Sequence, residues 1–262
     1  MSLSWSSRKQ LLYFSVFAGI ALILLVIFAV PVLAPKSTCT DNKQNGDEIG
    51  IDCGGGCAKL CSSQYQPLSI LWARAFPAGP SVYHALAYVE NKNIASGIKS
   101  ISYKFILKDE NNVLITEKIG STFINPNRST AIFEPSIYVG TGNRIPTYTT
   151  LQFLGSSPNW VAMDSASVQK LSVFTKDQEI VSTGTLSKLT ATVENKSFYD
   201  LSNIDVVAIV YDKKGNTMEI SKTLIDLLPA RSEKQVSFTW PKEIKDYGKI
   251  EVVPKVNPFS QY

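Results

Sequence analysis

The chain has 262 residues, of which 44% are hydrophobic and 18% are charged, and its formal net charge is +4 at pH 7. Charges of both signs alternate locally, as in Lys242-Glu243-Ile244-Lys245-Asp246, which is typical of a solvated surface. This pattern argues against nucleic acid as a partner, and the length leaves room for more than one domain.

The first feature along the chain is an uncharged apolar stretch over residues 11–34. About 24 residues at about 1.5 Å per residue give roughly 36 Å of helix, which exceeds the ~30 Å hydrocarbon core of a bilayer. The alternative is a cleaved signal peptide, whose apolar centre is only about 7–15 residues long. The small-x-small site that ends at Ala34 is followed by Pro35, which suits a peptidase poorly. We therefore expect an uncleaved, single-pass transmembrane helix.

The positive-inside rule predicts the orientation of this helix. Arg8 and Lys9 precede the apolar stretch, whereas only Lys36 closely follows it. Residues 1–10 are thus expected to be a cytoplasmic tail, with the remaining domains extracytoplasmic and the chain integral to the plasma membrane.

All four cysteines fall shortly after the apolar stretch, in a predicted cysteine-rich knot over residues 35–64: Cys39, Cys53, Cys57 and Cys61. An even number of clustered cysteines outside the cytoplasm indicates two disulfides, and the spacing does not choose among the three pairings. A structural zinc site is the alternative, but the spacing Cys-x13-Cys-x3-Cys-x3-Cys lacks the usual knuckles.

Oxygen-bearing side chains are also concentrated in the knot. Hard cations such as calcium prefer six to eight oxygen ligands, so this set allows a calcium site, while turn residues in contact with water are the other interpretation. The candidate ligands are Asp41, Asn45, Asp47, Glu48 and Asp52. Apart from calcium, no cofactor is predicted.

The knot resembles a short module found beside membrane anchors in bacterial and archaeal surface proteins, with the pattern Cys-x-Asp…Asn-x-x-Glu-x-Gly-x-Asp-Cys-Gly-Gly-x-Cys-x-x-Cys. The matching positions are Cys39, Asp41, Asn45, Glu48, Gly50, Asp52, Cys53, Gly54, Gly55 and Cys57. The last gap differs, since three residues precede Cys61. The resemblance implies a surface protein and no catalytic chemistry.

The remainder of the chain contains an internal repeat. The segment Tyr88-Val89-Glu90-Asn91-Lys92 recurs as Thr192-Val193-Glu194-Asn195-Lys196, and Pro126-Asn127-Arg128-Ser129 recurs as Pro229-Ala230-Arg231-Ser232. Two domains are therefore predicted, at residues 65–163 and 164–262.

Alternation of apolar and polar residues predicts that both domains are β. The alternating apolar sets are Ile101, Tyr103, Phe105 and Leu107; Leu189, Ala191 and Val193; and Val236, Phe238 and Trp240. Strands at intervals of about ten residues favour immunoglobulin-like antiparallel sandwiches. The predicted fold class is mainly β, with a transmembrane helix, a small disulfide-rich segment and two tandem sandwiches that form a short rod. Trp72, Trp160 and Trp240 are expected to pack in cores or between the domains.

The second copy resembles the FxLYD-type sandwich domains of prokaryotic envelope proteins. The resemblance is carried by the strand that ends at Asn195, by the apolar strand that ends in Tyr211-Asp212-Lys213-Lys214-Gly215, and by Leu228-Pro229-Ala230 before Phe238. Ala230 replaces the usual glycine. This family implies an extracytoplasmic module and transfers no catalytic residue.

Catalytic motifs are missing from the sequence. The single histidine, His84, lies at the start of a predicted strand and is expected to be structural, and no Gly-x-Ser-x-Gly, His-Glu-x-x-His or phosphate loop occurs. We therefore expect no enzyme but a membrane-anchored surface protein that acts as a binding or structural module, with strand edges or a loop such as 136–147 contacting a partner protein or cell-wall polymer. The alternative is an accessory subunit of an envelope assembly, such as a secretion, pilus or transport complex.

Overall fold

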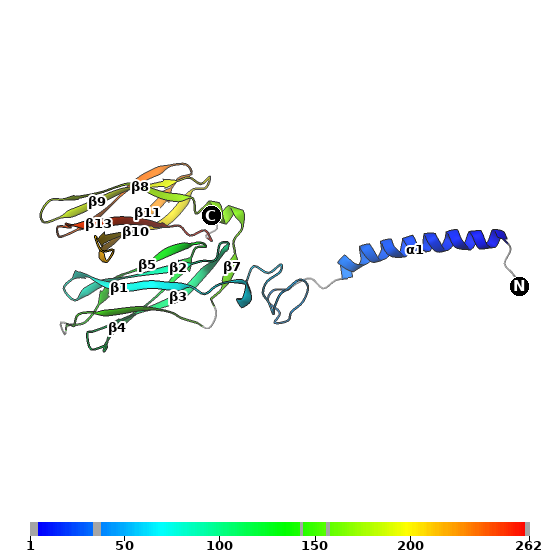
Figure 1. Cartoon of the computed structure of the whole chain (residues 1–262), viewed down its shortest axis with the longest axis horizontal. Helices are drawn as coiled ribbons and strands as arrows, with labels where there is room; N and C mark the ends of the chain where they lie inside the picture. The colour runs from blue at the N-terminus through cyan, green and yellow to red at the C-terminus, as the bar shows by residue number, and fades with distance from the viewer. Residues whose placement is uncertain (1–4, 34–37, 142–143, 156–157, 260–262) are drawn as a thin grey trace. The chain divides into compact units, whose positions relative to one another are not determined.

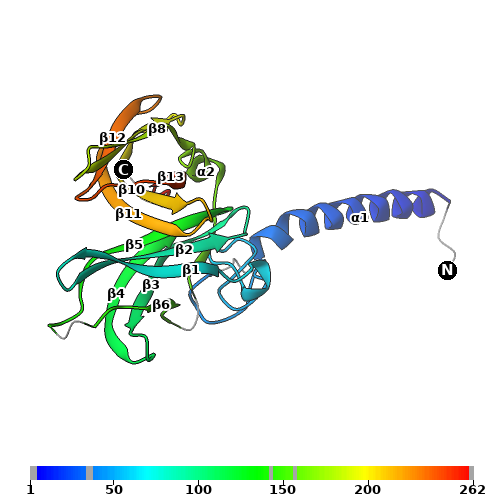
Figure 2. The same cartoon turned by 60° about the vertical axis from the view of Figure 1, so that its left-hand side comes forward.

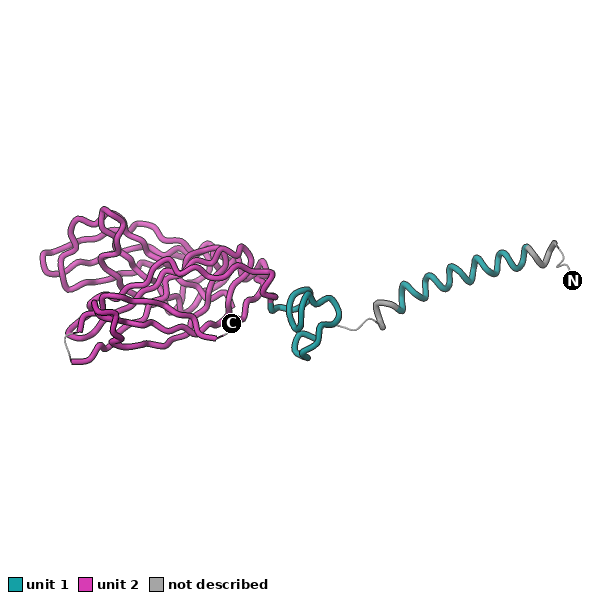
Figure 3. The backbone as a smooth tube through the Cα atoms, turned by 60° about the horizontal axis from the view of Figure 1, so that its bottom comes forward, with its two compact units in different colours: residues 1–59 teal, residues 60–262 magenta. Residues whose placement is uncertain are grey.

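The computed structural model describes residues 5–33, 38–141, 144–155 and 158–259, and shows one long N-terminal helix followed by β-structure (Figure 1). The chain divides into two compact units, Met1–Lys59 and Leu60–Tyr262 (Figure 3). Residues 1–4 of the predicted tail, residues 34–37 at the end of the predicted span, and part of the 136–147 loop lie outside the described residues.

Helix α1 (Trp5–Leu33) contains the predicted membrane span. Its Lys9–Ala29 stretch is long and apolar enough to cross a membrane. The large apolar side chains from Leu11 to Phe28 are exposed, Phe14 to 73%. An apolar surface of this extent is unfavourable in water, so the helix fits either a single-pass anchor or a signal sequence.

The second unit begins at Leu60, inside the range predicted for the knot. The backbone N–H of Leu60 donates to the carbonyl of Trp160 at 2.9 Å, and the ring of Tyr65 stacks on Trp160 with ring centroids 4.7 Å apart. The short 3₁₀ helix η1 (Ser62–Gln64) lies between these two contacts. The last residues of the predicted knot therefore pack as part of the sandwich unit.

The first sandwich consists of two antiparallel sheets with the strand orders β1-β2-β5 and β4-β3-β6, and β7 also pairs with β3. Its strands are β1 (Ser69–Gly79), β2 (Val82–Asn91), β3 (Ser96–Lys108), β4 (Leu114–Ile124), β5 (Arg128–Tyr138), β6 (Tyr148–Phe153) and β7 (Trp160–Ala162).

The second sandwich has the sheet orders β12-β9-β8 and β11-β10-β13, again antiparallel. Its strands are β8 (Val173–Ser182), β9 (Ser187–Asn195), β10 (Leu201–Asp212), β11 (Thr217–Leu228), β12 (Glu233–Trp240) and β13 (Tyr247–Lys255). When β1–β6 are matched in order with β8–β13, both sandwiches have the same sheet connectivity. The short helix α2 (Ser165–Gln169) that joins them was not expected from the sequence, and in it the side chain of Asp164 caps the N–H of Ser167 at 2.7 Å.

The alternation expected from the sequence is confirmed in both sandwiches. Along β9, β12 and the second half of β3, residues of the predicted apolar sets are buried, and their neighbours are more exposed. Each sandwich encloses its own hydrophobic core, with Trp160 1% exposed in the first and Trp240 5% exposed in the second. The predicted fold class, mainly β with an apolar N-terminal helix and antiparallel sandwiches, is therefore confirmed.

A third hydrophobic cluster joins the two sandwiches. The sheet β1-β2-β5 packs its outer face on the sheet β11-β10-β13, so that sheets from both sandwiches lie in successive layers (Figure 2). The buried members are Phe76, Leu86, Ala131, Val207, Ile209 and Ile220, and Trp72 packs against them. The two sandwiches therefore pack face to face through these sheets.

Candidate functional site

The cysteine segment is held by disulfides. Cys39 and Cys57 are bonded to each other with their Cα atoms 5.6 Å apart. Cys53 and Cys61 are also disulfide-bonded, and no cysteine is free. The prediction of two disulfides is confirmed, and the bond between Cys39 and Cys57 settles a pairing that the spacing left open.

The carboxylate of Glu48 lies beside one of these disulfides. Sγ of Cys39, Sγ of Cys57 and a carboxylate oxygen of Glu48 all lie within 4.8 Å of one another, a geometry compatible with a metal ion. Both sulfur atoms are bonded to each other, however, and zinc requires thiolates. While the disulfide is intact, Glu48 is the one member of this group that offers an anionic ligand atom.

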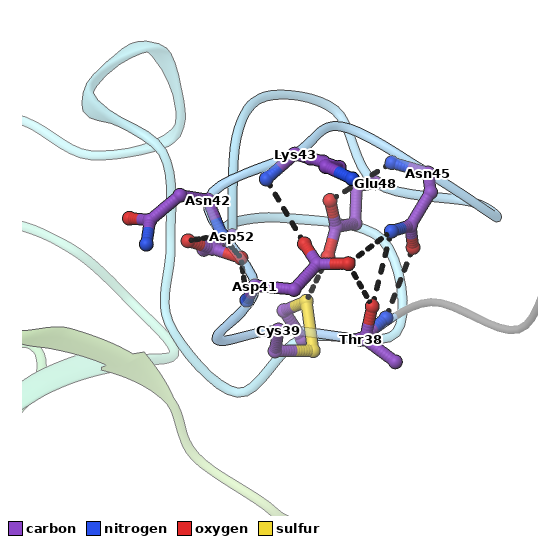
Figure 4. The surroundings of a disulfide bond; sticks show 9 residues. Thr38, Cys39, Asp41, Asn42, Lys43, Asn45, Glu48 and Asp52 are labelled. Carbon is purple, nitrogen blue, oxygen red and sulfur yellow. Dashed lines mark hydrogen bonds between the residues drawn. A yellow bond between two sulfur atoms is a disulfide. The ribbon is translucent and has the colours of Figure 1, made fainter.

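Asp41 organises the turns at the start of the segment (Figure 4). Its Oδ2 accepts hydrogen bonds from the Thr38 hydroxyl at 2.5 Å and from the Asn45 amide at 2.8 Å, and its Oδ1 accepts the backbone N–H of Lys43 at 2.9 Å. These donors, the Thr38 hydroxyl foremost, hold the pKa of the Asp41 carboxyl below its usual value because they favour the charged form.

Two further predicted calcium ligands are also engaged with the backbone. The carboxylate of Asp52 accepts the N–H groups of Asp41 and Asn42 at 3.0 and 2.9 Å. Oε2 of Glu48, which is 7% exposed, accepts the N–H of Asn45 at 3.1 Å. The structure therefore brings Asp41, Asn45, Glu48 and Asp52 into one hydrogen-bonded network, in which their side chains stabilise turns. A calcium ion would have to compete with these donors, and its binding stays a prediction.

Gly55 shows why the glycine run beside Cys53 is needed. Its φ is +58°, and an added Cβ would lie 1.9 Å from the backbone oxygen of Asp47. A side chain at this position would therefore both strain the backbone and collide with the neighbouring turn. The segment is small, with turns and a single β-bridge between Gly50 and Cys53, so covalent closure supplies the stability that a hydrophobic core gives elsewhere.

His84 has a structural environment. It lies on β2, where Nδ1 accepts the backbone N–H of Ser136 at 3.1 Å and the ring lies beside Phe133 with centroids 5.2 Å apart. Burial lowers its pKa, which keeps the ring neutral and able to accept that bond. The expected position at the start of a strand is confirmed.

Polar residues at the junction of the two sandwiches were not singled out from the sequence. The hydroxyls of Tyr88 and Tyr211 both donate to Glu251, to Oε1 at 2.5 Å and Oε2 at 3.1 Å. Burial, together with the nearby carboxylate, raises the pKa of both tyrosines. Arg74 donates to the carbonyl of Thr217 at 3.0 Å. One sequence signal was available: the unbroken apolar run Val206-Val207-Ala208-Ile209-Val210 in β10 is typical of a strand that is covered on both faces.

Two buried asparagines hold matching corners of the two sandwiches. Asn91 at the end of β2 donates to the carbonyls of Ser96 and Asn125, both at 2.8 Å. Asn195 at the end of β9 donates to the carbonyls of Tyr199, Leu228 and Pro229 at 2.8, 3.2 and 2.9 Å. Each asparagine is 1% exposed and ties the loop that follows its own strand to a second loop of the same sandwich. The repeated sequence segments thus place the same residue type in equivalent structural positions.

No family model matches the chain, and no curated protein matches it. Among solved structures, red sea bream transglutaminase is similar with a TM-score of 0.26 and 7% identity, over 72% of this chain and 29% of that protein. A β-glucuronidase from glycoside hydrolase family 2 has a TM-score of 0.21 and 8% identity, over 69% of this chain and 24% of that protein. The chain spans between about a quarter and a third of the length of these two proteins, and similarities of this size indicate no activity.

Proposed function

We propose that this protein is a single-pass membrane protein whose sandwich unit acts outside the cytoplasm as a binding or structural module. The observation that carries the proposal is the exposed apolar surface of α1 between Lys9 and Ala29, which a lipid bilayer would cover. The disulfide state of all four cysteines supports an extracytoplasmic location, because cytosolic thiols are normally kept reduced. Arg8 and Lys9, which precede the uncharged apolar stretch, support a cytoplasmic N-terminus.

The proposal treats the protein as a module without catalytic function. The single histidine is engaged with a backbone N–H and the cysteines are oxidised, so neither side chain is available as a nucleophile or general base in this state. Both sequence resemblances, to FxLYD-type domains and to the cysteine module of surface proteins, agree with this view.

We also infer that the two sandwiches are copies of one domain. The support comes from the equal sheet orders and from the matching roles of Asn91 and Asn195. The copies have diverged at the outer faces of β2 and β10, where each now packs on the other.

Protease treatment of intact cells tests the membrane proposal. The full chain is expressed with one epitope tag at each end, and the cells are treated with protease before and after permeabilisation. We expect the C-terminal tag to be lost from intact cells and the N-terminal tag to persist, with a cytoplasmic protein as the control for lysis. Retention of the C-terminal tag in intact cells would contradict the proposed orientation.

The N-terminal sequence of the purified chain tests the anchor itself. A chain that begins at its original N-terminus supports an uncleaved anchor, whereas a chain that begins after Ala34 would show that α1 belongs to a cleaved signal sequence. Native mass spectrometry of the detergent-extracted protein then separates a free-standing module from a subunit of an envelope assembly. A complex of fixed stoichiometry with other proteins would favour a subunit of an envelope assembly.

A further inference from the structure

Three strand edges meet at a cleft between the two sandwiches. The cleft has a volume of ≈ 480 Å³ and is lined by residues of β5, β8 and β13. Among the described strands, β5 pairs only with β2, β8 only with β9, and β13 only with β10, so each of the three lies at the end of its sheet. An end strand directs part of its backbone N–H and C=O groups away from its sheet, where they are able to pair with another extended chain.

The lining residues show that the strands face the cleft through their edges. Neighbours in sequence line it on both strands, residues 127–131 at the start of β5 and residues 250–255 of β13. Successive side chains of a strand point to opposite faces, so an uninterrupted run of lining residues indicates that the edge itself borders the cleft. In an antiparallel pair, about every second residue then has its N–H and C=O on this outer edge.

Two buried polar atoms at the cleft have no hydrogen-bond partner within the described structure. They are the hydroxyl of Thr130, a residue 3% exposed, and Oδ1 of Asn125, a residue 2% exposed. Both residues line the cleft. Nearly all buried polar atoms of native proteins are hydrogen-bonded, so these two atoms mark a part of the cleft wall where the internal hydrogen bonding is incomplete.

The charge at the cleft is positive. The guanidinium of Arg128 donates Nη2 to the carbonyl of Leu171 at 3.4 Å, and no carboxylate in the described part of the chain lies within ion-pair distance of it. Glu251 also lines the cleft, but its two oxygens accept the hydroxyls of Tyr88 and Tyr211. Arg128 is therefore free to form a charge-assisted bond with an incoming carboxylate.

We propose that the cleft binds an extended acidic segment of a partner protein, whose backbone pairs with the edge of β5 and whose carboxylate binds Arg128. This inference rests on the proposed function as a binding module. A peptide fits better than an acidic sugar or a free anion, because a strand edge offers alternating donors and acceptors at the spacing of another peptide backbone.

Fluorescence anisotropy tests the proposal on the full chain in detergent. The probe is a fluorescein-labelled peptide of alternating valine and glutamate residues. We expect Arg128→Gln to weaken its binding about tenfold, as for the loss of one charge-assisted hydrogen bond. Arg231→Gln is the matched control. It removes the same charge from the second sandwich, where the guanidinium lies 4.0 Å from the ring centroid of Phe198, and should leave binding unchanged.

A second probe separates backbone pairing from attraction between charges. The same peptide with N-methyl groups on alternate residues keeps its carboxylates but cannot donate along one edge, and we expect its binding to be lost. Urea unfolding of each variant confirms that it folds. Lysine in place of glutamate in the probe should also abolish binding, because the cation would face Arg128.

Several outcomes would overturn the inference. These are no binding of the valine–glutamate peptide at millimolar concentration, equal binding of the N-methylated probe, equal binding by Arg128→Gln, or binding of polygalacturonate but not of the peptide. If the sandwiches are accessible to protease on intact cells and the peptide does not bind, this inference fails while the proposed function stands. If the sandwiches are inaccessible, the proposed function fails whatever the peptide does.

Discussion

The buried asparagine of the second sandwich offers a sharp test of how the loops are held. Asn195→Ala removes the amide that donates to three carbonyls and the oxygen that accepts the backbone N–H of Ser197 at 2.9 Å and its hydroxyl at 2.7 Å. The side chain is 1% exposed, so water does not reach all of these groups in the native fold.

The size of the effect follows from the groups left without partners. The bonds to the carbonyl of Leu228 and from the N–H of Ser197 are both buried. Each unsatisfied buried group costs about 1–3 kcal/mol, so Asn195→Ala should lower the free energy of unfolding by about 2–6 kcal/mol. For a folding unit of this size, that corresponds to a fall in Tm of roughly 5–20 °C.

Urea unfolding of the full chain in detergent, followed by tryptophan fluorescence, measures this change. The buried indoles of Trp160 and Trp240 report on the two sandwiches. Asn91→Ala should lower the free energy of unfolding of the first sandwich by a similar amount. The control Asn111→Ala changes a residue in an exposed turn and should leave the free energy of unfolding almost unchanged. If the free energy of unfolding of Asn195→Ala lies within about 0.5 kcal/mol of that of the unmodified protein, this side chain does not hold the loops and the reasoning is refuted.

The remaining predictions concern the junction, the disulfides and the pH dependence. Burial lowers the pKa of Lys255 to about 8, below its unfolded value of 10.5, so from about pH 8 to about pH 9.5 the unfolded state binds more protons and the native state gains stability as the pH rises. Nearer pH 10 the raised pKa of Tyr88 and Tyr211 acts with the opposite sign, because only the unfolded tyrosines lose their protons there. Lys255→Met should remove the rise below about pH 9.5 in urea unfolding, and a flat profile for the unmodified protein in that window would contradict the assignment. Leu86, at the sandwich junction, is 0% exposed, so Leu86→Ala should lower the free energy of unfolding by about 2–5 kcal/mol. The control Leu114→Ala changes a side chain that is 47% exposed and should leave this free energy almost unchanged. Equal midpoints of urea unfolding for the two variants would show that the junction adds no stability. Replacing Cys39 and Cys57 together by serine should lower the stability of the cysteine segment alone by about 2–4 kcal/mol. We expect trypsin to cleave this segment faster, while the urea unfolding of the sandwiches stays unchanged. An unchanged cleavage rate would argue against a stabilising role of the disulfide. If calcium binds the predicted ligands in place of the backbone N–H groups that their carboxylates now accept, calcium should slow that cleavage and a chelator should restore its rate; an unchanged rate in both would argue against a calcium site.

Much of the fold follows from the sequence because the signals concerned are local. An uncharged stretch long enough to span a bilayer predicts a helix whatever surrounds it, and clustered cysteines predict disulfides from number and compartment. Alternation with period two predicts which face of β9 or β12 is buried, since a strand with one covered face has no other way to hide its apolar side chains. The internal repeat places Asn91 and Asn195 at matching positions of the two copies, and both residues end a strand.

Tertiary structure decided the disulfide pairing, the face-to-face junction and the cleft. Spacing left three pairings open, because which sulfur atoms meet depends on how the turns fold around Asp41 and Asp52. Leu86 and Ile209 look like additional core residues in the sequence, yet they are buried against the other sandwich. The cleft lined by Arg128, Thr130 and Asn125 exists because the edges of three strands meet there. The periodicity of one strand predicts which of its own faces is buried, but it does not predict which edges of other sheets lie beside it.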